Sequence, residues 1–215
     1  MSVIPADPLK PRKTPRQARS AATVAAIFEA TFQVLLTEGL VRLTTTRVAE
    51  RAGVSVGTMY QYFPHKQALL YALLDLYLEE VVVALEEACI HHEGGSLSSI
   101  ADGLVHAYLE AKLRHMPGSR ALYAVAAELD TADLVGDISR RVDNALARVL
   151  ASARDATFDD LPTVTFALRT LLVGTVRAVL ETDASPPSMA MLRAQLPVMC
   201  RAYLFAASRA LPPGP

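Results

Sequence analysis

The segment TTTRVAERAGVSVGTMYQYFPHK, from Thr44 to Lys66, constrains the fold more than any other part of this 215-residue chain. Read at helical period, it predicts two short helices, because apolar residues recur three or four positions apart on either side of Gly53. Glycine supplies the turn, and Ser55 is a favourable N-cap for the second helix. The positions expected to face inward are Val48, Ala49 and Ala52 in the first helix and Met59, Tyr62 and Phe63 in the second. Two short helices that cross at a small residue indicate a helix-turn-helix.

The same segment resembles the N-terminal motif of the tetracycline-repressor (TetR) family. The matching positions are Thr45, Ala52-Gly53-Val54-Ser55, Gly57-Thr58-Met59-Tyr60-Gln61-Tyr62-Phe63 and Lys66. Met59 departs mildly from the family's usual Leu or Ile, and His65 stands where a better helix N-cap is usual. The resemblance implies an all-α fold, with an N-terminal three-helix helix-turn-helix DNA-binding domain joined by a long helix to a C-terminal helical ligand-binding and dimerisation domain. It ends near Leu78.

Charge is unevenly distributed along the chain, although the net charge is only −1. Residues 1–66 hold nine Lys and Arg against four acidic residues, a net charge of +5, and the remainder has a net charge of −6. A basic end favours a polyanionic partner. Five of the nine basic residues lie between Lys10 and Arg19, so a solvated basic tail accounts for the charge equally well. The motif favours nucleic acid as the partner.

Composition allows a large core and argues against a membrane protein. Hydrophobic residues make up 52% of the chain, but no uninterrupted apolar stretch reaches the roughly 18–20 residues of a membrane span. The N-terminus is basic and rich in proline, without the apolar region of a secretory signal. We therefore expect a cytoplasmic protein with no membrane partner. Cys89 and Cys200 are most simply reduced core residues, with a redox-sensing pair as the alternative.

The rest of the chain reads as helix, and no segment shows the period-two alternation of a strand. Pro197 lies inside the last expected helix and should kink or interrupt it. The expected domains are a flexible basic arm at 1–15, a helix-turn-helix DNA-binding domain at 16–66 and a helical effector-binding and dimerisation domain at 67–215. The expected helices are 16–38, 45–52, 55–63, 66–90, 97–115, 119–129, 132–156, 161–182 and 188–211.

The outward face of the second motif helix has the size and chemistry of a major-groove reader. Gln61 can pair with an adenine edge, Thr58 can reach a base or a thymine methyl, and Gly57 allows close approach. Tyr60 is expected at a phosphate, with packing on the neighbouring helix as the alternative. The full set of expected DNA-binding residues is Arg16, Arg19, Thr45, Thr46, Arg47, Ser55, Val56, Gly57, Thr58, Tyr60, Gln61, Tyr62, His65 and Lys66.

A single head should bind DNA weakly, because no Arg or Lys lies between Val54 and Phe63 to read guanine. Two heads on a twofold dimer would read the paired half-sites of a palindromic double-stranded operator. Both of the last two helices are apolar nearly all round, which favours an intersubunit four-helix bundle, although they would also serve to close the monomer core. The expected homodimer contacts are Leu168, Leu172, Thr175, Val179, Leu192, Leu196, Met199 and Tyr203.

The resemblance also implies a pocket for an unknown small-molecule effector, expected to be hydrophobic or aromatic. The polar and aromatic candidates are His106, Tyr108, Tyr123, Phe166 and Arg169, each of which would serve equally as ordinary core or interface. No metal-ligand spacing occurs, so no metal and no cofactor is expected.

The leading hypothesis is a repressor that its effector releases from DNA. An activator of the same fold, or an all-α carrier or enzyme with a vestigial head, is the alternative. Catalysis is not expected, because the sequence holds no nucleophile–histidine–acid set and no phosphate loop.

Overall fold

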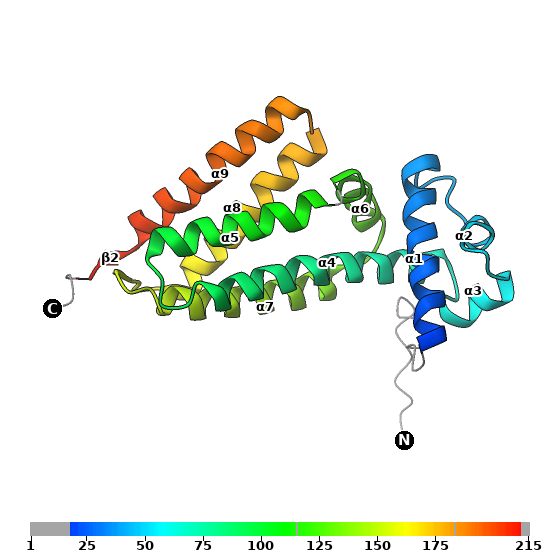
Figure 1. Ribbon diagram of the computed structural model, residues 1–215, viewed down its shortest axis with the longest axis horizontal. Coiled ribbons are helices and arrows are strands. Elements are labelled where there is room, and N and C mark those ends of the chain that lie inside the picture. Colours follow the sequence, from blue (N-terminus) through cyan, green and yellow to red (C-terminus); the bar gives the residue numbers. More distant parts are fainter. Residues whose placement is uncertain (1–17, 115, 183, 212–215) are drawn as a thin grey trace, which may run out of the picture. The chain divides into compact units, whose positions relative to one another are not determined.

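The computed structural model describes residues 18–114, 116–182 and 184–211, which are helical almost throughout (Figure 1). The expected all-α fold is confirmed. The helices are α1 (Ala18–Glu38), α2 (Thr45–Ala52), α3 (Val56–Tyr62), α4 (Lys66–His91), α5 (Leu97–Arg114), α6 (Met116–Glu128), α7 (Ala132–Ala151), α8 (Leu161–Thr182) and α9 (Pro186–Ala207). Two short strands, β1 (Ala156–Thr157) and β2 (Arg209–Ala210), pair in antiparallel fashion.

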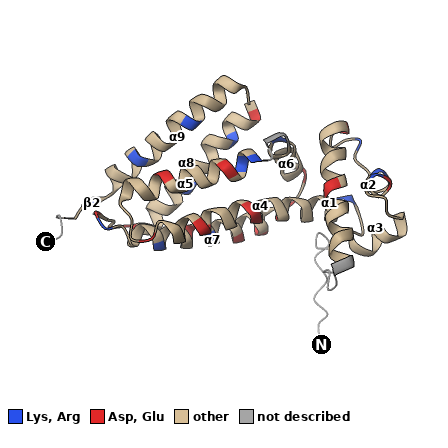
Figure 2. Ribbon diagram, in the orientation of Figure 1, with Lys and Arg blue, Asp and Glu red and all other residues tan. Residues whose placement is uncertain are grey.

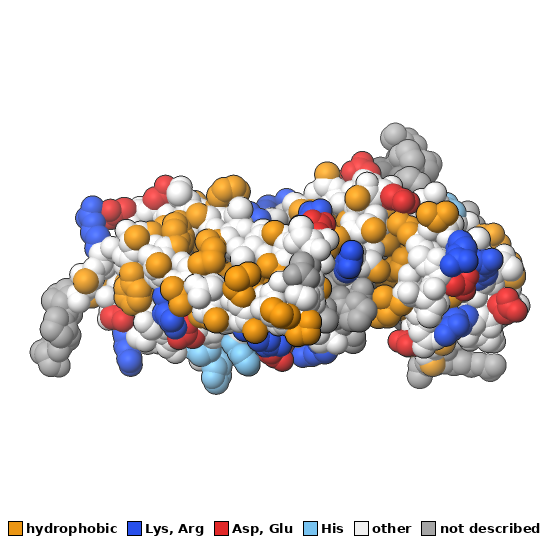
Figure 3. All heavy atoms as spheres, turned by 90° about the horizontal axis from the view of Figure 1, so that it is seen from above, with side chains coloured by type: hydrophobic (Ala, Val, Ile, Leu, Met, Phe, Trp, Pro, Cys, Tyr) orange, Lys and Arg blue, Asp and Glu red, His pale blue; other side chains and the backbone are white. Residues whose placement is uncertain are grey.

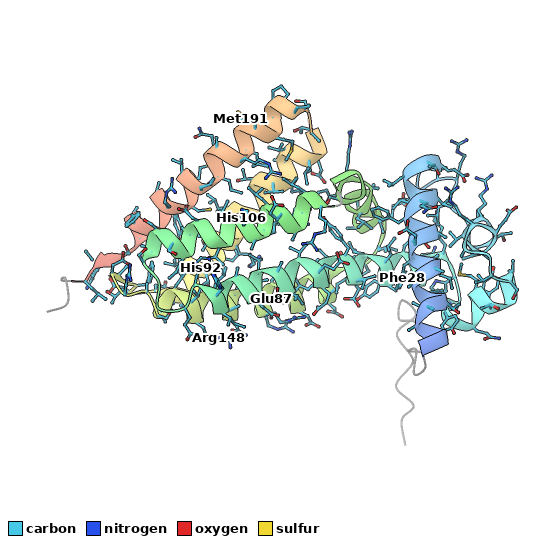
Figure 4. All side chains as sticks on the ribbon, viewed as in Figure 1. Phe28, Glu87, His92, His106, Arg148 and Met191 are labelled. Carbon is cyan, nitrogen blue, oxygen red and sulfur yellow. The ribbon has the colours of Figure 1, made fainter. Side chains whose placement is uncertain are left out.

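The chain divides into two compact units. The first, which we call the head, consists of the described residues up to Tyr77 together with 117–131, and the second, the body, consists of 78–116 and the described residues from Ala132 onward. In the head, α1 packs on α2 and α2 on α3. Ile27 of α1, Val48 of α2 and Met59 of α3 are fully buried there. The ring of Phe63 lies 5.6 Å from the ring of Phe28 and closes this small core (Figure 4).

Helix α6 belongs to the head, which the sequence did not suggest. Gly118 of α6 faces the ring of Phe32 of α1 so closely that a Cβ at this position would overlap the ring. On α4, the hydroxyl of Tyr77 makes a short hydrogen bond with that of Ser119, which is fully buried. The expected boundary at Lys66 therefore differs from the division of the structure, which groups the first turns of α4 and all of α6 after Met116 with α1, α2 and α3.

The body is built on α8 and α9, which pack on each other, on α5 and, for α8, on α7. Leucine is the commonest buried side chain of these helices. Ion pairs tie the outer edges together: Arg193 and Arg201 of α9 contact Glu110 and Asp102 of α5 at 3.0 and 2.6 Å. Figure 2 shows these charges as blue bands on α9 and red bands on α5. Exposed pairs of this kind contribute at most about 1 kcal/mol each, so the leucine core accounts for most of the packing energy.

Two of the expected helices end earlier than predicted, because the chain reverses at one end of the body. Helix α7 stops at Ala151 and α9 at Ala207. Asp155 then makes two connections: its Oδ1 accepts from the backbone N–H of Leu97, and its carbonyl accepts from that of Leu211. The sequence did not show where these two helices end, because both ends are rich in alanine, which favours helix. Pro197 does not interrupt α9, which continues through it.

Two features of the interior bear on the compositional expectations. By length and composition alone, α1 from Ser20 and α8 are apolar enough to cross a membrane, but core helices of soluble proteins pass the same test. Cys89 and Cys200 are both buried and make no disulfide. Burial raises the pKa of the Cys89 thiol to about 11 and that of Cys200 to about 12, so both stay protonated near neutral pH.

Candidate nucleic-acid interface

Helix α2 is fixed at both ends by its own sequence. At its start, the Thr44 side chain accepts a hydrogen bond from the backbone N–H of Arg47. At its end, Gly53 adopts a left-handed conformation with φ of 67°, which favours glycine because it has no Cβ. The N–H of Val54 then returns to the carbonyl of Ala49 at 3.0 Å. These contacts set the direction in which α3 leaves the turn.

Helix α3 begins at the expected cap. Ser55 accepts from the backbone N–H of Thr58 at 3.0 Å, and its hydroxyl lies 2.8 Å from the Thr58 hydroxyl. Met59 and, just after the helix, Phe63 are buried against α1 and α2, which turns the opposite face toward solvent. The exposed residues of that face are Val56, Gly57, Tyr60 and Gln61. No charged residue occurs between Val54 and Phe63, so the face is neutral.

Three expected DNA-contacting side chains make hydrogen bonds within the head. Thr45 is buried, and its hydroxyl lies 3.3 Å from that of Tyr60. Tyr62 is half-buried and donates to Ser20 of α1 at 3.3 Å. Thr58 has its hydroxyl in the α3 cap. Sequence periodicity alone does not show such hydrogen bonds, because a hydroxyl suits either a phosphate or a neighbouring helix.

The basic side chains of this region are held by the C-terminal end of α1 and the loop that follows it. The Nη1 atom of Arg47 lies 2.6 Å from Glu38 Oε2 and also donates to the carbonyl of Arg42 at 3.0 Å. Lys66 donates from Nζ to the carbonyl of Leu40 at 2.6 Å. Glu38 was missed by sequence reasoning, since it lies outside the motif and nothing in its spacing points to Arg47.

His65 caps α4 despite being an unusual residue for that position. Its Nδ1 accepts a hydrogen bond from the backbone N–H of Ala68 at 3.1 Å. The acceptor must be an unprotonated ring nitrogen, so the proton of the neutral ring is on Nε2. Thr46 is exposed on α2. Arg16 and the side chain of Arg19 lie outside the described residues.

The expected effector-pocket residues differ in burial and belong to both units. His106 and Phe166 are exposed, and Arg169 pairs with Asp143 at 2.7 Å, with its guanidinium 5.5 Å from the Phe166 ring. Figure 4 shows His106 on α5. Tyr108 is buried in the body, whereas Tyr123 belongs to the head.

Sequence reasoning missed Lys112, which is buried one turn after Tyr108 on α5. Its Nζ lies 6.0 Å from the Tyr108 ring centroid. Burial, together with the nearby Arg177 charge, lowers the pKa of Lys112 to about 8. A charged residue of this kind gives no sequence signal, because a lysine between apolar residues on a helix usually reaches solvent.

The expected dimer residues divide into two groups. Leu168, Leu172, Leu192 and Leu196 lie in the core of the protomer itself, so the expectation is wrong for these four. Met199 is exposed, and Thr175, Val179 and Tyr203 are half-buried. Met199 belongs to a set of large apolar side chains on α8 and α9 that face solvent, and orange side chains gather over this part of the body in Figure 3. The members of this set, the α8–α9 apolar face, are Phe166, Val173, Met191, Val198, Met199 and Phe205.

Comparison with known proteins places this architecture. Residues 27–73 match the model of bacterial regulatory proteins of the tetR family, and residues 96–204 match that of the tetracyclin repressor-like C-terminal domain. The chain belongs to the TetR family. It is therefore a DNA-binding transcriptional regulator by family, rather than a member of an enzyme family.

Solved structures agree with this assignment in fold. A proposed TetR-family regulator of Mesorhizobium loti has a TM-score of 0.70 and 17% identity, with 88% of this chain and 98% of that chain covered. A TetR-family regulator of Streptomyces coelicolor has a TM-score of 0.58 and 23% identity, with 86% and 99% covered. Among curated proteins, the nucleoid occlusion factor SlmA of Haemophilus influenzae is 27% identical over 105 residues. That match covers 49% of this chain. The chain spans about half the length of the curated relatives it matches.

Proposed function

We propose that this TetR-family protein is a cytoplasmic, homodimeric repressor that binds a palindromic operator through α3 and is released by a small-molecule effector. The observation that carries the proposal is the neutral, exposed face of α3, held in place by the Ser55 cap on one side and by buried Met59 on the other. A rigid helix with a small, uncharged outer face fits a major groove, which is about 12 Å wide.

Contacts to bases and to phosphates fall to different residues of the head. Gln61 offers a bidentate amide to an adenine edge, and Gly57 lets the α3 backbone come close to the bases. Exposed Thr46, the partly exposed Arg47 and the half-buried Lys66 and His65 surround this face and supply contacts to phosphates. Phosphate contacts set affinity and its dependence on salt, whereas base contacts set specificity.

A second copy of the chain is proposed to cover the α8–α9 apolar face. Six large apolar side chains exposed on two adjacent helices are more than a soluble monomer usually leaves in water. Figure 4 shows one of them, Met191, on the outer side of α9. Gly174 of α8 would meet no atom within 4 Å if it carried a Cβ, so this face has room for close approach by another helix. Two identical faces of this kind make an isologous twofold contact.

The effector is proposed to bind in the body and to change the half-site spacing that the dimer prefers. Tyr108 and Lys112 are the buried polar side chains of α5 that favour an apolar ligand with one polar anchor. The ligand need only bind one conformation more tightly than the other, with a coupling free energy of about 1–3 kcal/mol. The contact of Phe32 with Gly118, between α1 and α6, is a second feature that supports coupling, because it joins the motif to a helix that lies beyond α5 in sequence.

Selection of bound duplexes from a random pool by the purified full chain tests the operator proposal. The wild-type protein should select a palindrome, and Gln61→Ala should lose the preference for adenine at one position of each half-site. Gln67→Ala is the matched control, because Gln67 is an exposed glutamine of the head that lies outside α3.

Selection of the same palindrome by Gln61→Ala would show that the reading face is assigned wrongly. The absence of salt-dependent retention on duplex DNA, beyond that of the basic arm, would favour a carrier with a vestigial head. Binding that stays unchanged with every bound small molecule would contradict release by an effector.

A further inference from the structure

Val56 is an exposed apolar side chain at the first position of α3. Its exposed fraction is 39%, whereas Val48 of α2 is fully buried. The residues beside it on the outer face, Gly57, Tyr60 and Gln61, carry no charge. An exposed valine does not stabilise the free protein. Burying it against an apolar group of a binding partner is favourable, because apolar surface is then removed from water.

The other side chains of α3 are less suited to reading an apolar group. The Thr58 hydroxyl lies 2.8 Å from that of Ser55, and the Tyr60 hydroxyl lies 3.3 Å from that of Thr45. The Thr58 hydroxyl is thereby held in the cap of α3, and the Tyr60 hydroxyl is held at the start of α2. Tyr60 is exposed as well, but its hydroxyl is engaged with Thr45. Val56 and Gln61 are the exposed side chains of α3 whose ends make no hydrogen bond with a described residue, one apolar and one with an amide.

The major groove offers one distinctive apolar group, the C5-methyl of thymine. Guanine is read mainly by Arg or Lys, and neither occurs between Val54 and Phe63. The chemistry of the face is therefore complementary to A·T pairs rather than to G·C pairs.

We infer that Val56 reads the 5-methyl group of a thymine in each operator half-site, and that it is a specificity-determining residue of the head. This inference rests on the proposed function, since it requires α3 to lie in the major groove. Gln61 then reads adenine from the same helix, so the centre of each half-site is built of A·T pairs.

Deoxyuridine substitution tests the inference directly, because uracil pairs like thymine but lacks the methyl group. Each thymine of the selected operator is replaced singly by deoxyuridine, and the dissociation constant of the full-length dimer is measured by fluorescence anisotropy. At one position, the wild-type protein should bind about fourfold more weakly, the effect of one methyl group left unburied. Substitution in both half-sites should weaken binding more than tenfold, about the product of the two effects.

Protein variants identify the residue that reads the methyl group. Val56→Ala, which removes two methyl groups, should reduce the difference between the thymine and deoxyuridine operators. Val41→Ala is the matched control, because Val41 is an exposed valine of the head in the loop after α1, and it should keep the fourfold difference. Val56→Thr replaces one of the two methyl groups by a hydroxyl and should keep part of the difference, because the remaining methyl can still contact the thymine.

The outcomes separate this inference from the function on which it rests. Failure of the wild-type chain to select any sequence contradicts the proposed function. A selected half-site without a methyl-sensitive thymine contradicts the reading by Val56 alone. So does a methyl sensitivity that is undiminished in both Val56→Ala and Val56→Thr. Thermal melting of each variant establishes that it is folded, and an unfolded Val56→Ala leaves the comparison to Val56→Thr.

Discussion

The α2–α3 segment and the α8–α9 pair present surfaces of opposite character. The first is short, polar and closely capped, and the exposed side chains of α3 are uncharged. The second consists of two 22-residue helices with large apolar side chains both inside the protomer and on its surface. The difference teaches that an outward face is easy to recognise where polar residues mark it. It is hard to recognise where the buried and the exposed stripes have the same composition.

The largest expected effect comes from placing a charge on the α8–α9 apolar face. Val198→Glu should dissociate the dimer, because an unpaired carboxylate cannot be buried in an apolar contact. Loss of the second head should weaken operator binding by about 100-fold or more. Analytical ultracentrifugation and anisotropy measure the two effects.

Val135→Glu is the control for this variant. Val135 of α7 has the same exposed fraction as Val198, 48%, but lies outside the proposed contact. It should remain a dimer with normal operator binding. A dimeric Val198→Glu protein would show that the second copy binds elsewhere.

The buried stripe of the same helix should respond in a different way. Leu196 of α9 is fully buried, and Leu196→Ala should lower the free energy of unfolding of the protomer by about 2–5 kcal/mol through the cavity it leaves. Urea unfolding in a Val198→Glu background separates this effect from dimerisation. Met199→Ala, in which the exposed neighbour is truncated, should change protomer stability by less than about 1 kcal/mol. Similar losses for the two variants would contradict the division of α9 into core and interface.

These two helices show where sequence reasoning ends. Leu192 and Leu196 recur with the same period as Met199 and Tyr203, and spacing alone assigned them all to one interface. A helix with apolar residues nearly all round has two stripes, and only the packing of α5 and α8 shows which one the protomer buries. In the head, by contrast, α2 and α3 are mostly polar apart from one apolar stripe each, so only one face could be buried. Val48, Met59 and Phe63 were therefore placed correctly.

The contact between α1 and α6 had no sequence signal of its own. Gly118 reads as a helix breaker after Pro117, whereas its role is to leave space for Phe32. Gly118→Ala should lower the stability of the head by about 1–3 kcal/mol through overpacking. Combining it with Phe32→Leu, which shortens the facing side chain, should restore most of the loss in urea unfolding. If the losses of stability from the two substitutions simply add, positions 32 and 118 do not interact.

Gly57 offers a variant in which fold and function should respond with opposite signs. A Cβ at this position would meet only the Ser55 hydroxyl, at an ordinary distance of 3.7 Å. Gly57→Ala should therefore raise the stability of the head by up to about 1 kcal/mol, because alanine is the better helix former. The added methyl should hold α3 away from the bases and weaken operator binding by about tenfold. Operator binding equal to that of the wild type would show that the glycine is not needed for close approach.

The smallest expected effect concerns the acidic partner of Arg47. Glu38→Gln removes the charge of the 2.6 Å ion pair while keeping a side-chain oxygen, so Arg47 should interact more strongly with a phosphate. We expect operator binding to tighten about two- to threefold at low salt and the salt dependence to steepen by up to about one counterion. Protein stability should change little, because the pair is largely exposed. Glu50→Gln removes the same charge from an exposed glutamate of α2 that makes no ion pair with a described residue. If both variants steepen the salt dependence equally, the loss of one negative charge from the head explains the effect. The ion pair between Glu38 and Arg47 would then have no specific role.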